Sequence, residues 1–128
     1  AVVGVAAAPD FTDWGYTAEQ KAELQQSGKL EQSNPYGEEP QVTHRAFFES
    51  GAAMRLLHKP IMLDCAVRLV HGDADEDVPI GVAFKLLQDA HSGDVQLNII
   101  KWGDHRLSKP HEIETIVRTI AVLAEKIQ

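Results

Sequence analysis

The sequence is poor in cysteine and has no long apolar run. Its one cysteine, Cys65, excludes an internal disulfide and any zinc centre built from several cysteines. A chain without a disulfide framework fits a reducing compartment, so we expect the cytoplasm. A membrane-spanning helix needs roughly 20 consecutive apolar residues. No run of that length occurs, so we expect no membrane span.

Basic residues are also scarce. Lys and Arg together number 12 against 19 Asp and Glu, and the formal net charge is -7. Proteins that bind a phosphate backbone or an anionic membrane surface need a positive face. The charge balance therefore argues against a nucleic-acid partner.

What is present is the composition of a globular domain. The 128 residues are 44% hydrophobic and 24% charged, which predicts one domain with a packed core. The apolar opening from Ala1 to Ala8 has no charged leader and is too short for a signal peptide. We therefore expect the chain to start within a longer polypeptide.

Hydrophobic patterns predict a parallel α/β sheet. Residues 1–8 and 67–72 are apolar runs typical of buried central strands, and residues 95–100 alternate as a strand nearer the edge. Helices are expected over residues 17–26, 44–57 with Thr43 as N-cap, 80–90, and from Pro110 onward. The last helix carries an apolar stripe that we assign to the core: Ile113, Ile116, Val117 and Ile120. Strands joined by helical crossovers are typical of a parallel sheet.

Polar and histidine side chains follow two of the predicted strands. Ligands of open α/β sheets bind outside the carboxyl ends of the strands. The loop after residue 70 is acidic, and the loop after residue 100 holds His105. A carboxylate that accepts the ring N–H of a histidine fixes its tautomer and stabilises the imidazolium. The spacing therefore favours an acid and histidine pair, with Asp73, Asp75 or Asp77 as the acid.

Metal sites are not supported by the motifs. The acidic loop resembles the start of a calcium loop, but Val78 stands where glycine is required and Phe84 where glutamate is required. His111 and Glu112 lack the second histidine of a zinc-protease helix. We expect no metal and no other cofactor, and we interpret His71 as a structural residue of the turn.

At these loops the chain resembles the C-terminal half of the alpha/beta-hydrolase superfamily. The segment His71–Pro79 matches its acid-loop pattern H-G-x-x-D-x-x-V-P, and Gly103–Arg106 resembles its histidine loop. Further segments are similar to a subfamily of palmitoyl-protein thioesterases and acyl-glucuronide esterases with its bacterial relatives: Ala7–Phe11, Asn34–Gly37 and Asp104–Arg106.

The resemblance carries its own expectations. It implies that residues 1–128 are the C-terminal part of one alpha/beta-hydrolase domain and that residues 12–60, rich in polar residues, glycine and proline, form a small helical cap over an acyl pocket. It assigns Asp75 as the triad acid and His105 as the general base. Asp73 and Asp77 are then surface charges.

The chain departs from the family at the nucleophile. The family places a serine in G-x-S-x-G before the acid and the histidine, and this motif is absent. We expect a small-molecule ester or thioester substrate and a serine supplied by an N-terminal half outside this sequence, so the chain alone is predicted to be inactive. The alternative is an inert fragment or a non-catalytic binding or interaction module of hydrolase ancestry.

Overall fold

The computed structural model describes residues 1–127, which divide into two compact units. One unit contains Ala1–Pro9 and the chain from Leu56 onward, and the other contains Asp10–Arg55. None of the helices within the described residues is long and apolar enough to cross a membrane.

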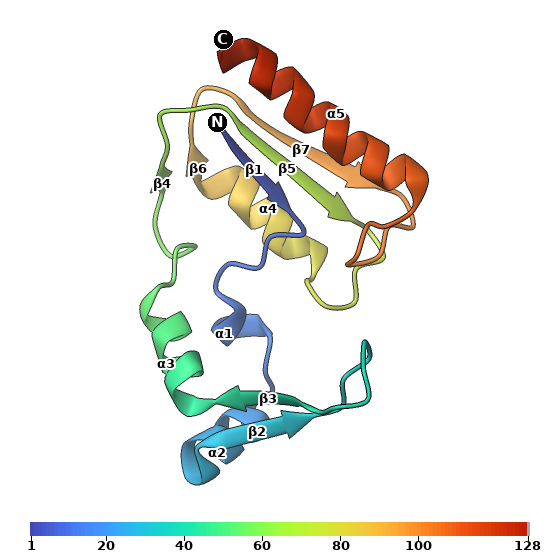
Figure 1. Ribbon diagram of the computed structural model, residues 1–128. Helices are drawn as coiled ribbons and strands as arrows, with labels where there is room; N and C mark the ends of the chain where they lie inside the picture. The colour runs from blue at the N-terminus through green and yellow to red at the C-terminus, as the bar shows by residue number, and fades with distance from the viewer. Residues whose placement is uncertain (128) are drawn as a thin grey trace. The chain divides into compact units, whose positions relative to one another are not determined.

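The first unit is built on a parallel sheet (Figure 1). Its strands are β1 (Val2–Val5), β5 (Val67–Gly72) and β7 (Val95–Ile100), in the spatial order β1-β5-β7. Parallel strands need a crossover connection, and α4 (Ile80–Asp89) supplies it between β5 and β7. The last helix, α5 (Pro110–Ile127), follows β7, and the two helices lie on opposite sides of the sheet. The predicted parallel α/β architecture is confirmed.

Two predictions of burial are wrong. β1 is an edge strand within the described residues, since it pairs with β5 alone, and Val2 and Val5 are 43% and 40% exposed. The predicted core stripe of α5 is largely exposed, because no element within residues 1–127 covers it: only Ile116 packs against the core, while Val117 is 57% exposed. Among the α5 residues whose burial is described, the buried apolar residue is instead Leu123, at 3% exposed.

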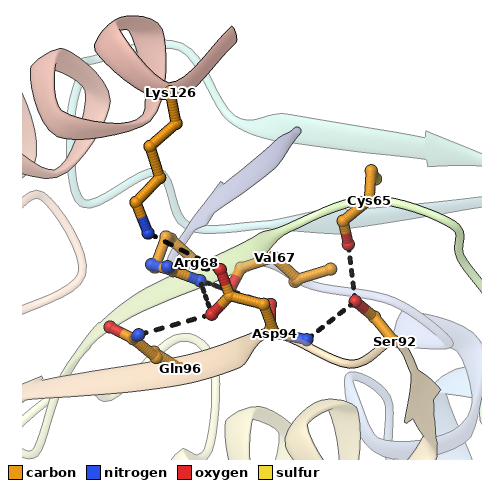
Figure 2. Close-up of polar contacts among 7 residues, drawn as sticks. All are labelled: Cys65, Val67, Arg68, Ser92, Asp94, Gln96 and Lys126. Carbon is orange, nitrogen blue, oxygen red and sulfur yellow. Dashed lines mark hydrogen bonds and ion pairs between the residues drawn. The ribbon is translucent and has the colours of Figure 1, made fainter.

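A buried arginine ties together the beginnings of β5 and β7 (Figure 2). The Arg68 side chain is 9% exposed, and its guanidinium donates to both carboxylate oxygens of Asp94 at 2.9 Å each. It also donates to the carbonyl oxygen of Val67 at 2.9 Å. The hydrogen bond from Arg68 lowers the pKa of the Asp94 carboxyl below its ordinary value. This fork-to-fork pair explains how an arginine is accommodated in a strand whose six residues are all buried.

The second unit contains three helices and a hairpin. Its elements are α1 (Phe11–Trp14), α2 (Ala18–Ser27), β2 (Lys29–Gln32), β3 (Gln41–His44) and α3 (Arg45–Ala53). The predicted helix over residues 17–26 is confirmed, and Thr17 closes a capping box with Gln20. The helix predicted over residues 44–57 begins one residue later, because Thr43 pairs with Leu30 in the hairpin and is not the N-cap. The helix ends at Ala53.

The β2–β3 hairpin was not predicted, because neither strand has the apolar alternation typical of a half-buried strand. Two further short strands of the first unit, β4 (Ile61–Met62) and β6 (Ala90–His91), pair in parallel and were not predicted either.

Candidate active site

The two loops that carry the predicted acid and histidine leave the sheet side by side. Gly72 of β5 is the register partner of Ile100 of β7, so the following residues start from the same edge. The amide of Asp73 donates to the Ile100 carbonyl at 3.1 Å, and the amide of Ala74 donates to the Gly103 carbonyl at 3.0 Å. Parallel pairing therefore brings segments about 30 residues apart into contact.

Two glycines permit this close approach. A Cβ added at Gly72 would clash with the carbonyl of Gly103. A Cβ added at Gly103 would lie 2.8 Å from Leu107 Cδ2 and 3.0 Å from Gly72 Cα. The glycines of the two sequence motifs thus act through backbone packing between the loops.

Asp75 lies at the centre of the two loops with a fully buried side chain. Its Oδ1 accepts the amides of Asp77 at 2.9 Å and Val78 at 2.8 Å. Its Oδ2 lies 3.0 Å from Nδ1 of His105 and 3.5 Å from Nε2 of His71. A buried carboxylate is stabilised by such convergent N–H donors.

His71 is the second histidine whose ring lies next to the Asp75 carboxylate. Its ring is buried, and its Nε2 lies 2.9 Å from the carbonyl oxygen of Val78. A carbonyl oxygen only accepts hydrogen bonds, so Nε2 carries the proton and donates it. The structural interpretation of His71 is therefore confirmed.

His105 presents one ring nitrogen to Asp75 and leaves the other available. The carboxylate oxygen can only accept, so Nδ1 carries the proton and Nε2 has the free lone pair of a neutral imidazole. The side chain is 36% exposed, whereas that of Asp75 is fully buried. This arrangement suits a base that is oriented on one side and open to a substrate on the other.

Strained backbone flanks this histidine. Trp102 and Leu107 have left-handed φ values of 59° and 45°, and each such residue costs about 1–3 kcal/mol. Asp104 offsets this cost by accepting the amides of Arg106 at 3.1 Å and Leu107 at 3.0 Å. Leu107 is also buried in the core cluster with Val70 and Ile100.

Asp73 is a surface charge with two specific hydrogen-bond partners. Its Oδ1 accepts the Trp102 amide at 2.6 Å, and its Oδ2 accepts the Lys101 ammonium at 2.7 Å. The hydrogen bond from Lys101 lowers the pKa of the Asp73 carboxyl below its ordinary value. Asp73 lies at the surface, as expected, and strand register places it opposite the start of the histidine loop, where it accepts these two donors.

The donor set does not fit a metal ion. Ligand atoms of Asp75, Asp77 and His105 lie within 4.8 Å of one another. Both oxygens of Asp75 already accept N–H donors, however, and Nδ1 of His105 carries a proton. A metal would have to replace these bonds, so we assign none to this cluster.

No serine hydroxyl within residues 1–127 hydrogen-bonds His105. Three of the serines instead donate to backbone carbonyls within or between loops and helices: Ser27, Ser50 and Ser92. The acid and the base are therefore brought together without a nucleophile from the described part of the chain.

Comparisons with known proteins agree with this architecture. No protein-family model matches the chain. The human mitochondrial palmitoyl-protein thioesterase ABHD10 is 30% identical to it over 131 residues, which cover 99% of this chain and 43% of that protein.

Two solved structures are similar. A candidate hydrolase from Agrobacterium vitis S4 superposes with a TM-score of 0.87 at 36% identity, over 94% of this chain and 48% of its own. The alpha/beta hydrolase domain-containing protein 10 from mouse superposes with a TM-score of 0.84 at 29% identity, over 98% of this chain and 52% of its own.

The chain thus spans less than half the length of the human thioesterase that it matches. Near-complete coverage of this chain and agreement in both sequence and fold establish the relationship. The chain is a homologue of the palmitoyl-protein thioesterases that it matches, corresponds to their C-terminal half, and has the fold of alpha/beta hydrolases.

Proposed function

We propose that this chain forms part of a serine esterase or thioesterase. In this proposal Asp75 and His105 act with a serine from an N-terminal half that lies outside residues 1–128. The observation that carries it is the 3.0 Å contact between His105 Nδ1 and a buried Asp75 carboxylate. An oriented imidazole with a free Nε2 is what activation of a serine requires.

The mechanism proceeds through a covalent acyl-serine. His105 Nε2 removes the serine proton as the serine oxygen attacks the acyl carbon, and Asp75 stabilises the imidazolium that forms. The imidazolium then protonates the leaving alcohol or thiol. In the second half His105 takes a proton from the water that attacks the acyl-serine. It then returns this proton to the serine oxygen as the bond to the acyl group breaks and the acid leaves. The oxyanion donors would come with the nucleophile.

The proposed substrate class is supported by the name of a relative and by the exposed apolar side chains of the second unit. The human relative is named a palmitoyl-protein thioesterase, so we propose an ester or thioester with a medium or long acyl part. We further propose that residues 12–60 form the cap over the acyl group. Apolar side chains available for this role are exposed in that segment, among them Phe47 at 57% and Met54 at 76%.

We propose that the protein is located in the cytoplasm. The lone cysteine supports a reducing environment. The name of the human relative places that protein in mitochondria, so the two compartments are the alternatives. Imaging of the tagged protein distinguishes them.

The test is denaturing mass spectrometry of the purified protein after treatment with a fluorophosphonate serine probe. We expect an adduct on a serine outside these 128 residues, and we expect His105→Ala to slow labelling by about 10²–10⁴-fold. His111→Ala removes an exposed histidine outside the two loops and is the matched control. Unchanged labelling in His105→Ala would refute the assigned base.

The second candidate is a non-catalytic interaction module. The exposed apolar face of α5 and the unpaired edge of β1 favour it, because such surfaces associate with other chains. A purified chain of 128 residues that carries no probe adduct and has no labelled partner would support this reading.

A further inference from the structure

A single carboxylate joins the acid loop to the histidine loop. Asp73 lies two residues before Asp75, and its Oδ1 accepts the backbone amide of Trp102 at 2.6 Å. Trp102 in turn lies three residues before His105. The Asp73 side chain is 23% exposed, and the contact itself lies at the surface.

The residue that Asp73 holds is in an unfavourable conformation. Trp102 has a φ of 59°, in a region that bulky residues rarely adopt without external support. Its amide is held by Asp73, and its carbonyl oxygen accepts the ammonium of Lys109 at 3.1 Å. The indole ring is 71% exposed, so core packing does not supply the support.

We infer that Asp73 is a positioning residue for His105, acting through the backbone amide of Trp102. The inference rests on the proposed function, since it concerns how the proposed base is held against Asp75. Removal of the contact lets the strained turn relax, and the imidazole loses its alignment with Asp75. A shift of the base by about 1 Å is enough to slow a reaction strongly.

A plain surface ion pair does not account for this geometry. The contact with Lys101 alone would be one, because the Lys101 side chain is 68% exposed and its ammonium also lies 4.1 Å from the Trp102 ring centre. The contact between Asp73 Oδ1 and the Trp102 amide is different, since it fixes the backbone of the loop that carries His105. The two contacts of Asp73 are therefore separable by substitution.

The first test measures the His105–Asp75 hydrogen bond in the chain itself. Proton and ¹⁵N NMR of the histidine rings, assigned with His105→Gln, report whether Nδ1 of His105 carries a hydrogen-bonded proton. We expect this signal in the wild type, in Asp73→Asn, whose amide oxygen still accepts from Trp102, and in Lys101→Met. We expect its loss in Asp73→Ala. Glu76→Ala is the control, because it removes an exposed carboxylate from the same loop.

The second test measures ester hydrolysis in the protein that contains the nucleophile. We expect Asp73→Ala to lower kcat about 10- to 100-fold with KM within about twofold of the wild type, and Asp73→Asn to restore most of kcat. If Asp73→Ala does not fold, Asp73→Ser takes its place, since its shorter side chain does not span both contacts.

The outcomes separate the inference from the proposed function. A wild-type protein without hydrolysis or probe labelling refutes the proposed function, whereas the NMR comparison still tests the positioning role. Equal signals and equal kcat in the wild type and Asp73→Ala overturn the inference. It is overturned equally if Asp73→Asn is as impaired as Asp73→Ala, or if Lys101→Met is, because the ion pair would then be the effective contact.

Discussion

Single residues set the separation of the two functional loops. Gly72 and Gly103 allow the backbones to touch, and Asp75 then reaches His105 across the gap. A side chain at either glycine would push the loops apart without removing any hydrogen-bonding group from the chain. The distance between acid and base is therefore sensitive to residues that carry no functional group.

At this scale we predict that Gly103→Ala destabilises the protein by about 1–3 kcal/mol, because its Cβ would meet Leu107 at 2.8 Å. Gly81→Ala is the matched control: its Cβ would meet no atom within 4 Å, and it lies in α4, so it should stabilise by about 0.5–1 kcal/mol. Urea unfolding monitored by circular dichroism measures both. Equal stability of the two variants would contradict the close approach of the loops.

Among the elements, α5 departs most from its sequence pattern. Ile113, Val117 and Ile120 form a row at helical spacing and are 48%, 57% and 49% exposed. The helix is held instead through Leu123, which is 3% exposed, and through the partly buried Ile116.

We predict that Val117→Ala changes stability by no more than about 0.5 kcal/mol, because its side chain is mostly in water. Leu123→Ala should cost about 2–5 kcal/mol, because it opens a cavity beneath the same helix. Urea denaturation of the 128-residue chain compares the two directly. A Val117→Ala cost as large as that of Leu123→Ala would show that the row is covered in solution.

The sequence pattern predicted the helix but misjudged its exposure. Periodicity places α5, and its observed bounds, Pro110–Ile127, begin at the expected proline. Periodicity states which residues prefer burial, however, and not whether a second surface is present to bury them. The same reasoning explains β1, which is apolar but lies at an edge of the described sheet.

For the molecule as a whole, the net charge of -7 and the ion pairs together determine how the stability of the fold depends on pH. Asp94 forms an ion pair with Arg68 at the start of the sheet. The Nζ atom of Lys126, in α5, lies 3.9 Å from Oδ2 of the same carboxylate (Figure 2). Arg68 keeps the pKa of Asp94 lower in the folded chain than in the unfolded one. The pair therefore stabilises the fold above the unfolded pKa, and this stabilisation is lost as the pH falls through the folded pKa.

We predict that Asp94→Asn is less stable than the wild type at neutral pH and loses less of its remaining stability on acidification. Urea midpoints between about pH 7 and pH 3 measure this difference. Asp64→Asn is the control, because it removes the charge of an exposed aspartate elsewhere in the same unit. Parallel pH curves for the wild type and Asp94→Asn would show that this carboxylate does not contribute to acid sensitivity.

The sequence by itself determined the alternation of strands and helices around the sheet, and the two loops where Asp75 and His105 lie. These features are local, since apolar periodicity, proline at helix starts and a short motif are read from neighbouring residues. The contact between Asp75 and His105 follows from parallel pairing, which aligns the ends of β5 and β7.

Only the tertiary structure decided which surfaces are covered and which loop residues touch. The bridge from Asp73 to Trp102 joins positions 29 residues apart and depends on the register of Gly72 with Ile100. The β2–β3 hairpin, the edge position of β1 and the exposed row of α5 likewise depend on neighbours that no local pattern contains. The physical reason is that burial and long-range hydrogen bonds are properties of pairs of segments, whereas sequence periodicity describes one segment at a time.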